Sequence, residues 1–213
     1  MRTPARSLVA FALVPLLLVV TGCGSGGSSA SKLAATGPPA GRYRGSIPPP
    51  GLQLPSFALH SYRGPLVRSS GLHGRVVLIT FLDTHCTTKC PIVASAVGQA
   101  LRRLTPGARE QVAPLAISVD PKGDTPASVR LFLRHRHALD LDFLIGSVRK
   151  FRPVWHAFGV LAAAQTGSAD FHSSDVRVFN RSGTWVSTMH AGVDLSPANL
   201  DHDLVAAMSD RQR

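Results

Sequence analysis

The sequence predicts an α/β domain in which helices flank a buried mixed sheet. Three observations support this fold class. Short, almost wholly apolar runs rich in β-branched residues alternate with longer segments whose apolar residues recur at three- and four-residue spacing. Near the C-terminus, a turn-rich tetrad separates two further short apolar runs. The length of 213 residues suits one such domain with targeting segments at its ends.

The first predicted strand covers residues 76–81, with the sequence VVLITF. A run this apolar is typical of a strand that is buried on both faces, so we expect it to be central in the sheet. Pro91 then opens a helical pattern that ends before Pro106. The loop between this strand and this helix carries Cys86 and Cys90.

The strand and helix pattern then repeats. Residues 112–119 read as a second buried strand, and Thr125 and Pro126 are a cap and first-turn pair that opens a helix through about His137. Ser147 is expected to cap another helix. The apolar residues of that helix form one stripe, which we interpret as core: Val148, Phe151, Val154, Trp155 and Phe158.

The C-terminal part predicts a β-hairpin followed by a helix. Residues 176–179 and 185–188 flank the turn-rich Asn-Arg-Ser-Gly tetrad, and Ser196 with Pro197 opens the last helix. A buried sheet with helices on both faces, closed by a hairpin and a helix, is the thioredoxin-like arrangement with an extra helical insertion.

The N-terminus has the pattern of an export signal. Arg2 and Arg6 precede an apolar run at residues 8–20, and small or polar residues lead to Cys23. The run is shorter than the roughly 20 residues needed to cross a bilayer as a helix. We therefore expect a cleaved signal peptide rather than a membrane span.

Residues 20–23 (Val-Thr-Gly-Cys) resemble the lipobox of bacterial lipoproteins, in which the cysteine is acylated and becomes the new N-terminus. We expect residues 1–22 to be the signal peptide and Cys23 to carry the lipid that holds the protein on the outer face of the cytoplasmic membrane. Residues 23–51 are first Gly/Ser-rich and then Pro-rich, which is typical of a flexible linker. The folded domain is then expected at residues 52–213.

The net charge is +11, of which the signal peptide supplies +2. Nucleic acid is not an expected partner for an exported protein. Three interpretations of the basic surplus stay open: a solvated face, attraction to anionic lipid, and attraction to an acidic docking surface.

Cys86 and Cys90 remain once Cys23 is assigned to lipid. A disulfide between them would enclose only three residues, so stability is a poor reason for their proximity. The start of a helix favours thiolate over thiol, and Lys89 adds to the positive field. Thiolates attack disulfides and also bind soft metals. An inert disulfide is the third alternative in an oxidising compartment.

The spacing of the cysteines bears on metal binding because a four-residue helical step puts both sulfurs on one side. Two thiolates and an imidazole suit cuprous ion, or cupric ion with a further ligand, whereas zinc usually needs a fourth protein ligand. Of nine histidines, His172 in the loop before the hairpin is the best placed, although it could simply be exposed. We expect His85 to point away, and His135 and His137 do not share a helix face.

Three motifs together resemble the Sco/SenC family. They are Thr-His-Cys through Cys-Pro at residues 84–91, Asp-Pro-Lys-Gly-Asp-Thr-Pro at residues 120–126, and Phe-His-Ser-Ser at residues 171–174. Their order along the chain matches the family, and the resemblance runs from about Leu52 to the C-terminus. A lipid anchor also suits bacterial members.

The resemblance implies that copper binds to Cys86, Cys90 and His172. It also implies that Asp120 or Asp124 lies near the site, where it tunes the metal or touches a partner. Both aspartates have ordinary explanations as well, since one ends a strand and the other precedes a helix N-terminus.

The function that the resemblance implies is a metallochaperone, not an enzyme, that helps to assemble the copper centre of cytochrome c oxidase subunit II by delivering copper or by reducing cysteines. The partner would be that subunit or another extracytoplasmic copper or thiol client. Two positions depart from the family, with Asp83 where an aromatic residue is common and Gly123 where an arginine is.

The main alternative is a thiol-disulfide oxidoreductase that uses only Cys86 and Cys90 as a redox-active pair. A peroxidase is disfavoured because Asp83 occupies the position where that pattern requires proline. A non-catalytic lipoprotein scaffold would leave the neighbouring thiols unexplained.

Overall fold

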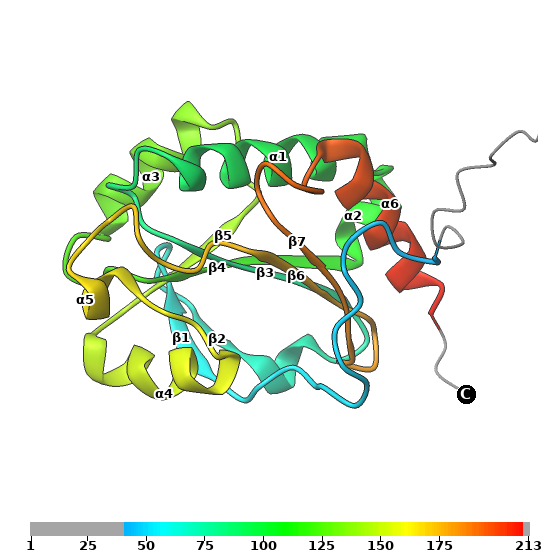
Figure 1. Ribbon diagram of the computed structural model, residues 1–213, viewed down its shortest axis with the longest axis horizontal. Coiled ribbons are helices and arrows are strands. Elements are labelled where there is room, and N and C mark those ends of the chain that lie inside the picture. Colours follow the sequence, from blue (N-terminus) through cyan, green and yellow to red (C-terminus); the bar gives the residue numbers. More distant parts are fainter. Residues whose placement is uncertain (1–40, 211–213) are drawn as a thin grey trace, which may run out of the picture. The chain divides into compact units, whose positions relative to one another are not determined.

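The computed structural model describes residues 41–210 (Figure 1). The predicted signal peptide, the predicted lipid site Cys23 and the first part of the predicted linker lie outside these residues. Within the described range, no helix combines the length and apolar character that a bilayer span requires.

One seven-stranded mixed sheet forms the centre of the fold, in the order β2-β1-β5-β4-β3-β6-β7. β3 pairs parallel with β4 and antiparallel with β6. All seven residues of β3 are buried, which confirms the central strand predicted from its apolar run. The strands are β1 (Ala58–Ser61), β2 (Leu66–Arg68), β3 (Val76–Leu82), β4 (Val112–Ser118), β5 (Asp142–Ile145), β6 (Val176–Phe179) and β7 (Trp185–Met189).

Helices cover both faces of this sheet, with α1 and α3 on one side and α4 on the other (Figure 1). Alternate residues of β3 face the two layers. Val76 and Leu78 pack in the core with α1, α3 and α6, whereas Val77 and Ile79 pack in the core with α4. The helices are η1 (a 3-10 turn, Ser69–Leu72), α1 (Lys89–Arg103), α2 (Pro106–Glu110), α3 (Pro126–His135), α4 (Val148–Phe158), α5 (Ala163–Thr166) and α6 (Pro197–Met208).

Two of the three predicted helix caps form their hydrogen bonds, whereas Ser147 is the N-cap residue of α4 but its side chain makes no cap hydrogen bond. The Thr125 hydroxyl accepts a hydrogen bond from the Ser128 backbone N–H at 3.1 Å, and Ser196 caps α6 in the same way. Helix α1 begins at Lys89 rather than at the predicted Pro91, because proline is tolerated in a first turn, where its missing N–H has no partner to lose. The predicted hairpin is present as β6 and β7.

The apolar stripe of α4 is core, as predicted. Phe151, Val154, Trp155 and Phe158 are buried against the sheet. The Trp155 indole N–H also donates to the Ser118 carbonyl at 3.0 Å, so its one polar group is satisfied inside the core.

Residues 41–51, which the sequence analysis assigned to the linker, pack against the edge strand β7 and helix α6. Ser46 exchanges two backbone hydrogen bonds with Thr188, at 2.8 and 2.9 Å. The Gly45 backbone is buried so closely that a Cβ there would lie 2.3 Å from the Ser187 Oγ. The folded body therefore includes residues before Leu52, because their backbone groups pair with an otherwise open sheet edge.

Asp203 of α6 is the acceptor that holds this segment. Its side chain is fully buried. Its carboxylate accepts hydrogen bonds from the Arg44 N–H at 2.7 Å, the Gly45 N–H at 3.1 Å and the Ser187 hydroxyl at 2.6 Å. The segment before the first strand is thus tied to the last helix.

Substitution of Asp203 by alanine is expected to lower the free energy of unfolding by about 2–4 kcal/mol, because buried donors lose their acceptor. Urea unfolding followed by circular dichroism measures the change. Asp201→Ala is the matched control, since Asp201 is partly exposed and, among residues 41–210, pairs with Arg103 alone. Equal unfolding midpoints for the two variants would contradict this role of Asp203.

Candidate metal centre

The two cysteines lie where β3 passes into α1. Cys86 belongs to the connecting loop and Cys90 to the first turn of α1. The Cys90 backbone N–H donates to the Cys86 Sγ at 3.4 Å. Both side chains are buried, with 4% and 0% exposed, and neither forms a disulfide. The four-residue helical step thus brings the sulfurs together, as the spacing predicted.

His172 reaches the sulfurs from the loop between α5 and β6. Its Nε2 lies 3.2 Å from the Cys90 Sγ. Its Nδ1 lies 2.6 Å from the Ser173 carbonyl oxygen, so a proton on Nδ1 is donated there and Nε2 keeps its lone pair. One ligand atom from each of Cys86, Cys90 and His172 lies within 4.8 Å of the others. The structure therefore brings the three predicted ligands together.

Asp170, which the sequence analysis did not single out, joins the histidine loop to the cysteine loop. Its carboxylate accepts hydrogen bonds from the backbone N–H groups of Thr87 at 2.9 Å and Thr88 at 3.2 Å. It also accepts from both threonine hydroxyls, at 3.3 and 3.0 Å. The hydrogen bond from the Thr87 N–H is the main cause that lowers the pKa of Asp170 to about 2. This carboxylate holds the two residues that precede α1, and the cap residue Thr88 makes no side-chain cap hydrogen bond.

The surroundings of the two thiols shift the pKa of Cys86 and the pKa of Cys90 in opposite directions. The hydrogen bond that Cys86 shares with Cys90 is the main cause that lowers the pKa of Cys86 to about 4, and it outweighs the opposing effect of burial. The same hydrogen bond, together with burial, raises the pKa of Cys90. At neutral pH the pair therefore holds one thiolate, on Cys86, and one proton, on Cys90.

His172 is drawn toward its charged form by the same thiolate. Burial by itself lowers the pKa of His172, but hydrogen bonds with Cys86 and with the Ser173 carbonyl outweigh that effect and raise it. An imidazole and a thiolate that attract one another in this way can also converge on a soft cation, which would replace the shared protons.

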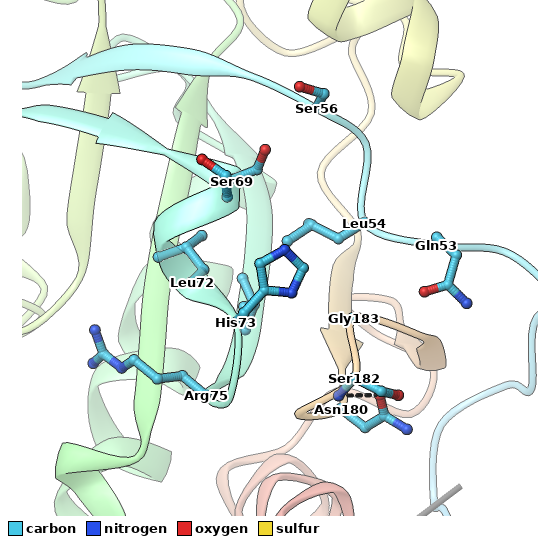
Figure 2. A pocket seen from close by; sticks show the side chains of 12 residues that line it. Gln53, Leu54, Ser56, Ser69, Leu72, His73, Arg75, Asn180, Ser182 and Gly183 are labelled. Atoms are coloured by element: carbon cyan, nitrogen blue, oxygen red, sulfur yellow. Dashed lines mark hydrogen bonds between the residues drawn. The ribbon is translucent and has the colours of Figure 1, made fainter.

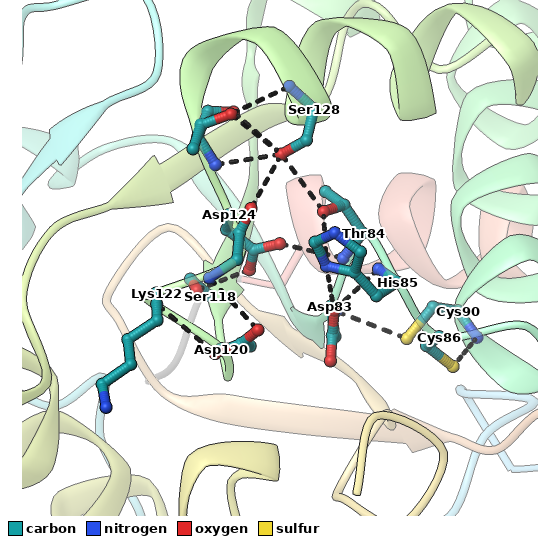
Figure 3. A network of polar contacts seen from close by, with 12 residues as sticks. Asp83, Thr84, His85, Cys86, Cys90, Ser118, Asp120, Lys122, Asp124 and Ser128 are labelled. Carbon is teal, nitrogen blue, oxygen red and sulfur yellow. Dashed lines mark hydrogen bonds and ion pairs between the residues drawn. The ribbon is translucent and has the colours of Figure 1, made fainter.

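Behind the sulfurs lies a network of buried carboxylates (Figure 3). Asp83 is 1% exposed, and burial raises its pKa. Its backbone N–H donates to the Cys90 Sγ at 3.5 Å, and its carboxylate accepts from the His85 N–H at 2.7 Å. The His85 Nδ1 lies 3.4 Å from the same carboxylate, so this ring is turned toward Asp83, in agreement with the expectation that it points away from the sulfurs.

Asp124 supports the cysteine loop from one layer further back, and Asp120 holds the turn that precedes Asp124. Asp124 accepts from the Thr84 N–H at 2.9 Å and from the Ser118 hydroxyl at 2.6 Å. Burial is the main cause that raises the pKa of Asp124 to about 6. Asp120 accepts from the backbone N–H groups of the turn that follows it. The hydrogen bonds of both carboxylates go to loop groups and not to the sulfurs.

Gly123, where the resembled family has arginine, is required by the packing of this turn. A Cβ at this position would lie 2.3 Å from the Asp120 Oδ2 and 2.7 Å from the His85 Cε1. The absence of a side chain therefore lets the turn close on His85.

A separate cavity of about 270 Å³ lies at the other end of β3 (Figure 2). Its wall includes His73 and Arg75 before β3, and Asn180 and Ser182 in the hairpin turn. Figure 2 shows the hydrogen bond that joins Ser182 to Asn180. None of the predicted site residues lines this cavity, so we assign it no part in the metal centre.

Comparison with known proteins gives concordant results. The sequence profile of one family, SCO1/SenC, matches residues 49–208. A SCO2-like protein of Rickettsia conorii is 27% identical over 150 residues, which are 68% of this chain and 71% of that protein. The mitochondrial SCO2 homologue of Bos taurus is 33% identical over 110 residues, 51% of this chain and 41% of that protein.

Solved structures are similar over most of the described residues. The Bradyrhizobium japonicum ScoI structure with copper bound gives a TM-score of 0.63 at 27% identity, covering 74% of this chain and 100% of that one. Apo Sco1 of Thermus thermophilus gives a TM-score of 0.58 at 28% identity, covering 78% of this chain and 94% of that one. These similarities confirm the predicted thioredoxin-like fold.

Replacement of Asp170 by alanine is expected to loosen the cysteine loop, because the Thr87 and Thr88 amides lose their only acceptor in the described structure. Hydrogen exchange should become faster at these two amides. Asp140→Ala is the control, since Asp140 is exposed and far along the chain from both loops. Unchanged protection of Thr87 and Thr88 in Asp170→Ala would contradict the clamp.

The reduced, metal-free protein is expected to hold one thiolate at neutral pH. A titration of thiolate ultraviolet absorbance should show a first step near pH 4, because the pKa of Cys86 is lowered to about 4, and a second step only well above the usual thiol range. The Cys86→Ser variant should lack the first step. Two thiols that ionise together near pH 9 would show that the shared hydrogen bond is not formed.

Proposed function

The chain belongs to the SCO1/SenC family, and from this premise we propose that it binds one copper ion through Cys86, Cys90 and His172. The observation that carries the proposal is the position of the three ligand atoms, all within 4.8 Å of one another. The copper-bound relative from Bradyrhizobium japonicum supports the choice of metal.

The donor set suits copper as a cargo. Two sulfurs and one imidazole nitrogen are soft ligands that favour cuprous ion, and cupric ion would need a further ligand. Cys86 already carries a negative charge at neutral pH, so metal binding displaces the proton held by Cys90 and any proton that His172 shares with the Cys86 thiolate. The sulfurs are buried, whereas His172 is partly exposed. Exchange with a client ligand therefore begins at the histidine.

The proposed role is that of a metallochaperone, not an enzyme, for the copper centre of cytochrome c oxidase subunit II or of another extracytoplasmic copper or thiol client. The export pattern and the lipobox support a position on the outer face of the bacterial cytoplasmic membrane, with lipid on Cys23. A tethered protein of this kind meets its membrane-bound client at a raised local concentration.

A second candidate function, thiol-disulfide exchange, is favoured by the split acidity of the two thiols. The Cys86 thiolate would attack one sulfur of a client disulfide and release the other as a thiolate, forming a mixed disulfide. Cys90 would then lose its proton and attack the Cys86 sulfur. The products are a reduced client and a disulfide between Cys86 and Cys90, with two electrons transferred.

Copper titration of the reduced full-length protein in detergent tests the leading proposal. Wild type should bind one cuprous ion in competition with a chelator, and the Cys86→Ser/Cys90→Ser variant should bind none. His172→Ala should weaken binding by about a hundredfold, because one of three ligands is lost. His156→Ala is the matched control, since His156 is exposed on α4.

The same samples distinguish the second function. They are mixed with glutathione disulfide, and the released thiol is measured. A wild type that takes up no copper, yet reduces the disulfide in a reaction that needs both cysteines and tolerates His172→Ala, would overturn metal binding and establish the oxidoreductase.

A further inference from the structure

A small cavity of about 260 Å³ lies beside the cysteine loop, and we call it the basic pocket. It is lined by Thr84, His85, Ser128, Leu131, Phe132, His135 and Arg136. We propose that the basic pocket binds a carboxylate side chain of the protein that exchanges copper or electrons with Cys86 and Cys90. This inference rests on the proposed function and names a feature of its partner.

The lining of the basic pocket has the chemistry of an anion site. Arg136 contributes a guanidinium, His85 and His135 contribute imidazoles, and Thr84 and Ser128 contribute hydroxyls. Arg136 and His135 can donate hydrogen bonds to an oxygen anion, whereas the Thr84 and Ser128 hydroxyls already have acceptors and the His85 Nδ1 lies 3.4 Å from the Asp83 carboxylate. No carboxylate is among the lining residues. The lining residues themselves therefore carry no negative charge that would repel an anion.

Arg136 supplies the strongest single indication of a missing partner. Its Nε atom is buried, and within residues 41–210 no hydrogen-bond partner lies in reach of it. Its guanidinium carbon lies 6.0 Å from the centre of the Phe132 ring. A buried donor without an acceptor is costly, and a planar guanidinium matches the two oxygens of a carboxylate. A carboxylate that enters the basic pocket would pair with this guanidinium.

The nearest carboxylates of the chain do not fill this role. Asp83 and Asp124 lie behind His85, with 1% and 4% of their surfaces exposed. Figure 3 shows that both face the network beneath the cysteine loop, where they accept from the backbone N–H groups of His85 and Thr84. Neither lines the basic pocket, so its outer side stays open to an external anion.

The position of the basic pocket relates it to the metal centre. Thr84 and His85 immediately precede Cys86, and the Thr84 hydroxyl donates to the Ser128 hydroxyl of α3 at 3.3 Å. A client that presents its own ligands to Cys86 therefore has neighbouring side chains over this pocket. Leu131, 54% exposed on the lining, offers an apolar contact for the methylene groups of an aspartate or glutamate.

Charge and size favour a protein carboxylate over other occupants. The chain carries a net charge of +11, so an acidic surface on the client is complementary. The volume of about 260 Å³ is small for a folded element but sufficient for one side chain. The predicted contact is thus a single acidic residue that fixes the orientation of the client while its metal or thiol site meets the cysteines.

The test uses nuclear magnetic resonance on the labelled full-length protein in detergent, titrated with N-acetyl-glutamate methylamide. Saturable shifts are expected at the Thr84, His85, Ser128 and Phe132 amides. Arg136→Gln should weaken binding by about tenfold, because one charge-assisted hydrogen-bonding group is lost. Arg134→Gln is the matched control, since it removes the same charge from an exposed position of α3 outside the pocket.

Several outcomes would overturn the inference. They are the absence of saturable shifts, equal shifts with the neutral N-acetyl-glutamine methylamide, and equal weakening by Arg134→Gln and Arg136→Gln. Tighter binding of inorganic phosphate than of the glutamate probe at the same amides would also overturn it, in favour of a phosphate site.

Copper titration of the same variants separates this inference from the proposed function. We expect Arg136→Gln to bind copper like wild type, because Arg136 is not among the three ligands. Loss of both copper and glutamate binding in this variant would mean that the site has collapsed and would overturn the pocket. A wild type that binds glutamate but no copper would instead refute the proposed function alone.

Discussion

The antiparallel pairing of β6 with β3 is the constraint on which the site depends. Thr80, near the end of β3, pairs with Val176, the first residue of β6. The chain that enters β6 must therefore arrive at the edge of the sheet where β3 delivers the cysteines into α1. His172 lies only four residues before β6, so the topology itself brings an imidazole beside two sulfurs that are more than 80 residues earlier in the sequence.

Two anions lie near the N-terminus of α1, where backbone N–H groups without helical partners create a positive field. The Asp170 carboxylate occupies the outer position and accepts from the N–H groups of Thr87 and Thr88. The Cys86 thiolate occupies the inner position and accepts from the Cys90 N–H. The Thr87 N–H is the main cause of the low pKa of Asp170, whereas the main cause of the low pKa of Cys86 is its hydrogen bond with the Cys90 thiol, to which the Cys90 N–H adds. One helix end thus fixes the loop geometry and prepares a ligand in its charged form.

Local signals in the sequence predicted the parts of the fold that local physics determines. In each case the signal and the structure that it specifies lie within a few residues of one another in the sequence. Examples are the apolar run of β3, the Thr125 and Ser196 caps and the turn of the β6–β7 hairpin. Strands β1, β2 and β5 were not predicted, because they have only three or four residues and partly exposed patterns. Their pairing comes from neighbours in the sheet, which composition does not reveal.

The same distinction applies to residues 41–51 and to the site. A Gly- and Pro-rich segment has the composition of a linker, yet here its backbone completes a sheet edge and Asp203, more than 150 residues later, accepts from it. Asp170 was missed because its partners lie 82 and 83 residues away. His172 was preferred over the other histidines because its loop precedes the predicted hairpin, and the family resemblance strengthened that choice, since periodicity does not report which loops meet.

Burial explains how such a site could release what it holds. The sulfurs are almost fully covered, so a client ligand cannot reach them through the core of the domain. The histidine loop is the more exposed wall, and four hydrogen bonds to one exposed carboxylate hold it in place. Hydrogen bonds at the surface are weaker in net terms than buried ones, since water can replace them. A client that competes for Asp170 or for the threonine donors would therefore open the metal centre from the histidine side, while α1 keeps the Cys90 sulfur in place.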